Sequence, residues 1–197
     1  MKNRLTSNLD FYRNIFLMAA AVHKQATMKY EPNGWEKVAT DENDASALCS
    51  LDAMVRHTCK LCAFEENEEQ STLHHACHLA ARIQMYLTID ASLSRIVQID
   101  VDPDEPMKYI TPEFVRYCVD YNIGEVDDPY HNLPMYSKYR TFMAILLSKI
   151  MLVDQDRSAD FNAELFRQVM LFLRSVIQSN PLVIKSAMTM FPDKTAV

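Results

Sequence analysis

Glycine is scarce in this 197-residue sequence, which contains only Gly34 and Gly124. Hairpin-rich β folds need many residues with positive φ, a conformation that glycine adopts most readily. Leu, Met, Ala and Glu, which favour helices, are abundant instead. The sequence therefore predicts an all-α protein, folded as a compact bundle of about six to seven helices.

The sequence also lacks a hydrophobic run long enough to cross a bilayer. Its longest apolar run, Phe142 to Val153, is interrupted by Ser148 and Lys149 and is shorter than the ~20 residues that a transmembrane helix needs. There is no signal-peptide pattern, and five cysteines, an odd number, fit free thiols in a reducing compartment. We therefore expect a cytoplasmic protein with no membrane partner.

Positive charge is in short supply as well. The chain has 20 Lys and Arg residues against 26 Asp and Glu, a formal net charge of −6 and a pI near 5.5. Such a surface repels a phosphate backbone, which argues against extended nucleic acid as a partner. A small phosphate ligand stays compatible with this charge, because metal ions held by carboxylates can supply positive charge.

Several motifs that carry chemistry are missing, among them a glycine-rich phosphate loop and G-x-S-x-G. Cys59 and Cys62, followed by His74 and His78, approximate the spacing of a two-cysteine, two-histidine zinc site. However, the two cysteines continue an apolar stripe at helical spacing, formed with Leu48, Leu51 and Val55. We therefore interpret them as core residues and expect no structural zinc.

Apolar periodicity and capping residues place the expected helices at about residues 8–28, 45–64, 71–93, 112–121, 135–153, 159–179 and 181–190. Apolar residues alternate with polar ones at residues 97–101, a pattern that permits one isolated strand. The segment from residue 100 to residue 129 contains nine acidic residues but only two basic ones, and prolines are scattered along it. We expect one helical region at 1–94, with this acidic, Pro-containing connector and the C-terminal helices of 95–197 packed on the same unit.

The helix expected at 135–153 has a large apolar face, formed by Met143, Leu146, Leu147, Ile150 and Met151. An apolar face of this size is unfavourable in water. We therefore expect this face to be buried against other helices or against a second subunit of a homo-oligomer.

Histidines cluster in one part of the chain, since four of the six lie between His57 and His78. On a helical wheel at ~100° per residue, His75, His78 and Arg82 fall within ~60° of one another. Histidine can carry protons near neutral pH, and arginine binds phosphate. The alternative is an ordinary solvated helix face, because any surface helix carries polar residues opposite apolar ones.

Three elements occur in a characteristic order along the first half of the chain. They are Lys29-Tyr30 with Gly34-Trp35-Glu36-Lys37, then Ala53-Met54-Val55-Arg56-His57, then His75-Ala76-Cys77-His78. In order and approximate spacing they resemble the N-terminal domain of the phage and bacterial dATP/dGTP diphosphohydrolases, over about residues 9–87. These enzymes are similar in function to the all-α MazG-like pyrophosphohydrolases.

The resemblance implies a phage-type protein that binds a purine deoxynucleoside triphosphate and hydrolyses dATP or dGTP to monophosphate and pyrophosphate. It implies Mg²⁺ or Mn²⁺ as cofactor. The candidate catalytic residues are His57, His75 and His78. The candidate substrate-binding residues are Lys29, Trp35, Arg56 and Arg82, with Trp35 stacking on the base. The candidate metal ligands are Glu65, Glu68 and Glu69; the alternative for this acidic run is a solvated linker.

Two other functions remain open. A non-catalytic phage protein could sequester a nucleotide or bind and inhibit a host protein. Gln70 favours this alternative because it stands where the family has an acid, and so does Arg82, which stands where an asparagine is usual. A structural helical assembly protein is the third reading, supported by twelve methionines and by apolar late helices suited to an oligomer interface.

Overall fold

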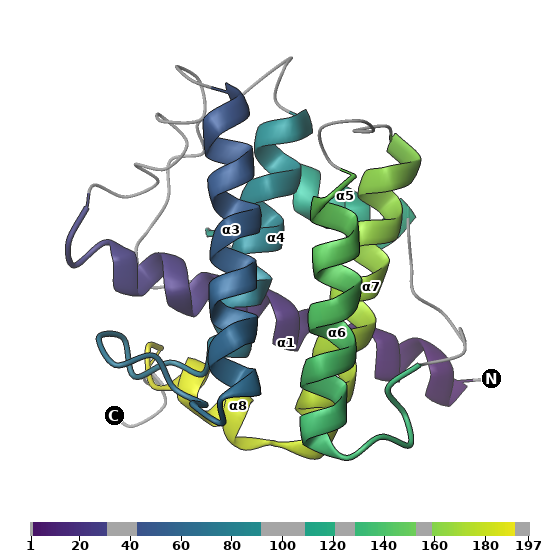
Figure 1. The fold of residues 1–197 in the computed structure, drawn as a ribbon. Helices are drawn as coiled ribbons and strands as arrows, with labels where there is room; N and C mark the ends of the chain where they lie inside the picture. The colour runs from purple at the N-terminus through teal and green to yellow at the C-terminus, as the bar shows by residue number, and fades with distance from the viewer. Residues whose placement is uncertain (1, 31–42, 92–108, 121–128, 153–158, 192–197) are drawn as a thin grey trace.

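The computed structural model describes residues 2–30, 43–91, 109–120, 129–152 and 159–191 (Figure 1). In these ranges the chain forms seven helices: α1 Lys2–Ala26, α3 Asn43–Cys62, α4 His75–Ala91, α5 Pro112–Asp120, α6 Met135–Ile150, α7 Ala159–Ser179 and α8 Leu182–Met188. The described residues form no strand and contain one isolated bridge, Asn67–His74. The all-α class is confirmed. Residues 97–101, where a strand was expected, lie outside the described ranges.

Helix α4 lies at the centre of the fold and packs against α1, α3, α5, α7 and α8. Helices α3, α4, α7 and α6 form a ring of neighbours, with α1 crossing the other side of α4 (Figure 1). Most side chains from Leu73 to Ile89 are therefore buried, and Tyr86 donates a hydrogen bond to Asn162 on α7 at 2.8 Å. This burial includes the polar face that carries His75 and His78.

The buried face of α3 differs from the predicted stripe. Leu51, Met54, Thr58 and Leu61 are buried, whereas Cys59 is exposed and Cys62 is half-buried. The buried stripe is therefore displaced by about one residue, or ~100° around the helix. The prediction that both cysteines are core residues was wrong, because contact with α4 and α6 on two sides selects the face that points between those helices.

Helix α6 buries only part of its predicted apolar face. Leu146 is fully buried, and Phe142 stacks on Phe172 of α7 with ring centroids 4.1 Å apart. Leu147 is 44% exposed and Met151 78% exposed, so these two side chains are not buried within the chain. The aromatic contact with α7 fixes the rotation of α6 and leaves its outer side open.

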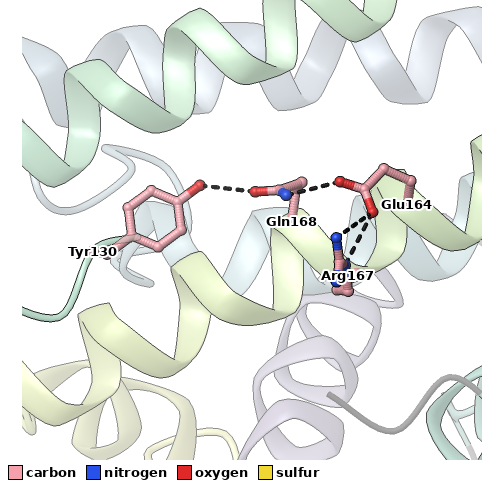
Figure 2. A network of polar contacts seen from close by, with 4 residues as sticks. All are labelled: Tyr130, Glu164, Arg167 and Gln168. Atoms are coloured by element: carbon pink, nitrogen blue, oxygen red, sulfur yellow. Dashed lines mark hydrogen bonds and ion pairs between the residues drawn. The ribbon is translucent and has the colours of Figure 1, made fainter. Parts of the chain in front are cut away.

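A network of polar contacts connects Tyr130, in the turn that precedes α6, with residues of α7 (Figure 2). The Tyr130 hydroxyl donates to Gln168, whose amide donates to Glu164 at 2.9 Å. Arg167 pairs with the other oxygen of the Glu164 carboxylate at 2.8 Å. This network joins Tyr130, in the segment before α6, to α7, and α6 itself packs beside α3. No described helix is both long and apolar enough to span a bilayer.

Candidate functional site

The end of α3 is closed by backbone hydrogen bonds. The Phe64 N–H donates to Leu61 O and the Glu65 N–H to Lys60 O, both at 3.0 Å, which is the Schellman pattern of a helix C-terminus. Phe64 accordingly has a left-handed backbone, with φ of 62°. The chain therefore turns sharply after Ala63 instead of extending α3.

The start of α4 is held by its own set of contacts. His74 caps the helix, since its Nδ1 accepts the Ala76 N–H at 3.0 Å. The His75 N–H donates to Glu66 O at 2.8 Å, and the His74 N–H donates to the Ser186 hydroxyl of α8 at 3.3 Å. These bonds place the first turn of α4 directly beside the last turns of α3.

Three predicted site histidines meet at this junction. Nδ1 of His57 on α3 lies 2.9 Å from Nδ1 of His75 on α4, so one ring donates and the other accepts. The His57 ring also stacks on His78, with centroids 4.4 Å apart and planes 16° from parallel. His75 is 4% exposed and His78 8% exposed, whereas His57 is half-buried. The solvated-face alternative is therefore wrong for His75 and His78.

The three imidazoles are neutral at neutral pH. Burial, then the charges of His78, His75 and the two nearby arginines, lowers the pKa of His57 to about 2. Burial lowers the pKa of His78 to about 4 and also lowers the pKa of His75. A neutral imidazole keeps one lone pair and one N–H, so the cluster can accept and donate hydrogen bonds.

Arg82 adds a positive charge one turn beyond His78, and no carboxylate of the described residues pairs with it. In the part of the chain that the structure describes, its Nε is buried without a hydrogen-bond partner, and its Nη1 donates to the Met85 sulfur at 3.5 Å. Burial lowers the Arg82 pKa, and the charge of Arg56 lowers it further. Arg56 is exposed and pairs with Asp52 at 3.1 Å. Two guanidinium groups that repel each other beside neutral histidines form a setting that favours an anion.

Lys29 is the remaining predicted substrate residue that the structure describes. Lys29, beyond the end of α1, donates a hydrogen bond to the Gln70 amide oxygen at 2.6 Å. Gln70 belongs to the α3–α4 connection, so Lys29 lies next to that loop. Trp35 lies outside the described residues, and its place relative to the histidines stays a prediction.

The three predicted metal ligands do not form one cluster. Glu65 is exposed and paired with Lys60, and Glu69 is exposed. The Glu68 carboxylate accepts the Ser71 N–H at 2.6 Å. Among the described residues, no three His, Cys, Asp or Glu side chains are grouped so that they could hold a metal ion. A Mg²⁺ ion that binds together with substrate phosphates commonly takes only one or two protein carboxylates, so binding of this kind does not require such a group.

Two neighbours of the cluster were not predicted. The Ser71 hydroxyl lies 3.0 Å from Nε2 of His78 and thereby holds that ring in place. His23 on α1 is buried near Arg82, and its Nε2 lies 3.3 Å from the Gln84 amide nitrogen. The helix expected from residue 71 begins at His75, so Ser71 lies in the turn before it, and no spacing linked His23 to the later histidines.

A sequence model of the dATP/dGTP diphosphohydrolase N-terminal family matches residues 5–96. The resemblance seen in the motifs is confirmed for this segment. No curated protein and no solved structure matches the sequence. The matched segment contains all of α1 but its first three residues, together with α3 and α4, and hence His57, His75, His78 and the two arginines. The match supports a nucleotide-related function for this part of the chain.

Proposed function

We propose that the junction of α3 and α4 binds the phosphates of a purine deoxynucleoside triphosphate and hydrolyses dATP or dGTP to monophosphate and pyrophosphate. The convergence of His57, His75 and His78 carries this proposal. These residues come from two motifs separated by the α3–α4 loop, and they meet within hydrogen-bonding and stacking distance. Both motifs lie inside the segment that matches the family.

The electrostatics support a phosphate ligand. Arg82 and Arg56 supply positive charge, and a bound phosphate would give the Arg82 guanidinium the anionic partner that it lacks among the described residues. The negative charge of the ligand would also raise the pKa values of the neighbouring histidines. The cluster would then be ready to accept a proton only when substrate is present.

The proposed reaction is attack of water on the α-phosphorus, with cleavage of the bond from that phosphorus to the oxygen bridging to the β-phosphate. A histidine of the cluster would accept the proton of the water, and pyrophosphate would leave. His57 is the most exposed of the three rings and is therefore the one that water reaches most readily. A divalent ion bound with the triphosphate would neutralise charge on the phosphates.

Binding without turnover is the second candidate function. Its support is that Glu65 and Glu68 are engaged in local contacts with Lys60 and Ser71. With these two carboxylates engaged, the site could hold the phosphates through arginine and histidine alone. In that case the protein would sequester the nucleotide.

Incubation of the protein with a panel of nucleoside triphosphates, with Mg²⁺, with Mn²⁺ and with chelator, tests both candidates. Release of pyrophosphate and dAMP or dGMP would support hydrolysis. Calorimetric binding of dATP or dGTP without any product would select the sequestering function. Absence of both binding and product for every nucleotide would refute the proposal.

Histidine variants then test the site itself. His75→Ala or His78→Ala should abolish binding or turnover, whereas His131→Ala, an exposed histidine before α6, should leave both unchanged. Circular dichroism of each variant distinguishes loss of the site from loss of the fold. Parent-like affinity in folded His75 and His78 variants would mean that nucleotide binds elsewhere.

A further inference from the structure

Phe64 occupies an unusual position for an aromatic residue. It has φ of 62° at the C-terminus of α3, a place and conformation that favour glycine. Its side chain is nevertheless 67% exposed, so burial in the core does not explain the ring. A strained backbone and an exposed aromatic side chain coincide at this residue, and exposed aromatic surface of this kind often marks a binding site.

The Phe64 ring forms part of a stack. It lies against Tyr136 at the start of α6, with centroids 5.0 Å apart and planes 15° from parallel. The Arg140 guanidinium lies over the Tyr136 ring at 5.4 Å. Tyr136 is itself 39% exposed. The two rings therefore present a flat aromatic surface whose outer layer, Phe64, is open to solvent.

This stack adjoins the histidine cluster. Two residues after Phe64, the Glu66 carbonyl accepts the N–H of His75 at 2.8 Å. Burial lowers the pKa of His75, and the charges of Lys60 before the turn and of Glu65 after it also act on that pKa. The turn that carries Phe64 and the histidine cluster thus both lie near the C-terminal end of α3, with Phe64 against Tyr136 of α6 and His57 against His75 and His78 of α4.

We propose that the outer face of Phe64, supported by Tyr136, is the surface on which the purine base of the nucleotide stacks; this inference rests on the proposed function. A planar ring suits a parallel stack better than an aliphatic side chain does. The exposed Glu65 and Glu66 beside Phe64 do not repel an uncharged base, and their oxygens can accept hydrogen bonds from its exocyclic amino group. The triphosphate would extend from there towards Arg56 and Arg82.

The test uses 2-aminopurine deoxyriboside triphosphate, whose fluorescence is quenched when the base stacks on an aromatic ring. The full-length parent should quench this probe and should also bind inorganic tripolyphosphate. Phe64→Gly removes the ring and places the preferred residue at the left-handed position, so this variant should fold at least as well as the parent. It should lose the quenching and bind dGTP or dATP roughly five- to a hundredfold more weakly, with tripolyphosphate binding unchanged.

Phe64→Trp should retain the quenching, and Leu182→Ala, at an exposed apolar residue on α8, should behave like the parent. Unchanged quenching and affinity in Phe64→Gly would overturn the stacking inference while leaving the proposed function intact. If Phe64→Gly changes the oligomeric state but not the nucleotide affinity, the stacking inference is also overturned, because the ring would then be covered by another copy of the chain. If the parent binds neither nucleotide nor tripolyphosphate, the proposed function fails and the stacking inference fails with it.

Discussion

The Arg82 guanidinium is largely buried, and no carboxylate among the described residues pairs with it. A buried charge without a partner is destabilising, so Arg82→Met should leave the melting temperature unchanged or raise it. The same variant should bind a triphosphate about ten- to a hundredfold more weakly, because it loses charge-assisted hydrogen bonds. Thermal melting and calorimetric titration with dGTP measure the two effects. A less stable variant with full affinity would assign Arg82 a structural role.

His74 stands next to the site residue His75 and has a different role. Its Nδ1 caps α4, and its ring is buried beside α8. His74→Ala should therefore destabilise the protein by about 0.5–2 kcal/mol through loss of the cap. His74→Asn, which keeps a capping oxygen, should lose less. Urea unfolding measures both changes, and a large loss of nucleotide affinity in a folded His74→Ala protein would contradict this assignment.

At the scale of the element, α6 offers two neighbouring leucines with opposite environments. Leu146 is fully buried where α6 packs against the other helices, whereas Leu147 is almost half exposed. Leu146→Ala should lower the free energy of unfolding by about 2–5 kcal/mol. Leu147→Ala should change it by at most about 0.5 kcal/mol in the monomer. Denaturant unfolding compares them, and a large effect of Leu147→Ala that depends on protein concentration would instead place this residue in an interface between copies.

The whole molecule should lose stability in acid because desolvation lowers the pKa of histidines on α1, on α3 and at the start of α4. The pKa is lowered to about 3 for His23, about 2 for His57 and about 4 for His74 and His78. Below pH ~6.5 the unfolded chain binds protons that these folded histidines exclude, so the free energy of unfolding falls as pH falls from ~6.5 to ~4. Melting temperatures across this window should fall in the parent.

A matched pair of variants isolates the histidine contribution to this pH dependence. His78→Gln should flatten the decline of melting temperature, because one group with a lowered pKa is removed. His131→Gln should show the parental decline, since His131 is exposed. A stability that does not change between pH 6.5 and pH 4 would show that these histidines are not buried in the neutral form.

The sequence by itself determined the helices and the motif order. Two glycines, apolar periodicity and capping residues are local signals, so the extents of α5 and α7 follow from them closely. The spacing of His75 and His78 likewise placed both on one side of α4. These properties depend on residues a few positions apart, which is the range over which helical geometry acts.

Only the tertiary structure decided which faces are buried and which side chains meet. The buried stripe of α3 differs by about one residue from the predicted stripe, because α3 packs against both α4 and α6. Leu147 of α6 is exposed because the stacking of Phe142 on Phe172 turns the opposite face of α6 towards α7. The contact between His57 and His75 depends on the sharp turn at Phe64. No signal in the sequence marks this turn, because a phenylalanine and not a glycine has the positive φ there. Such contacts join residues far apart along the chain, and their geometry is set by close packing of the whole core rather than by local propensity.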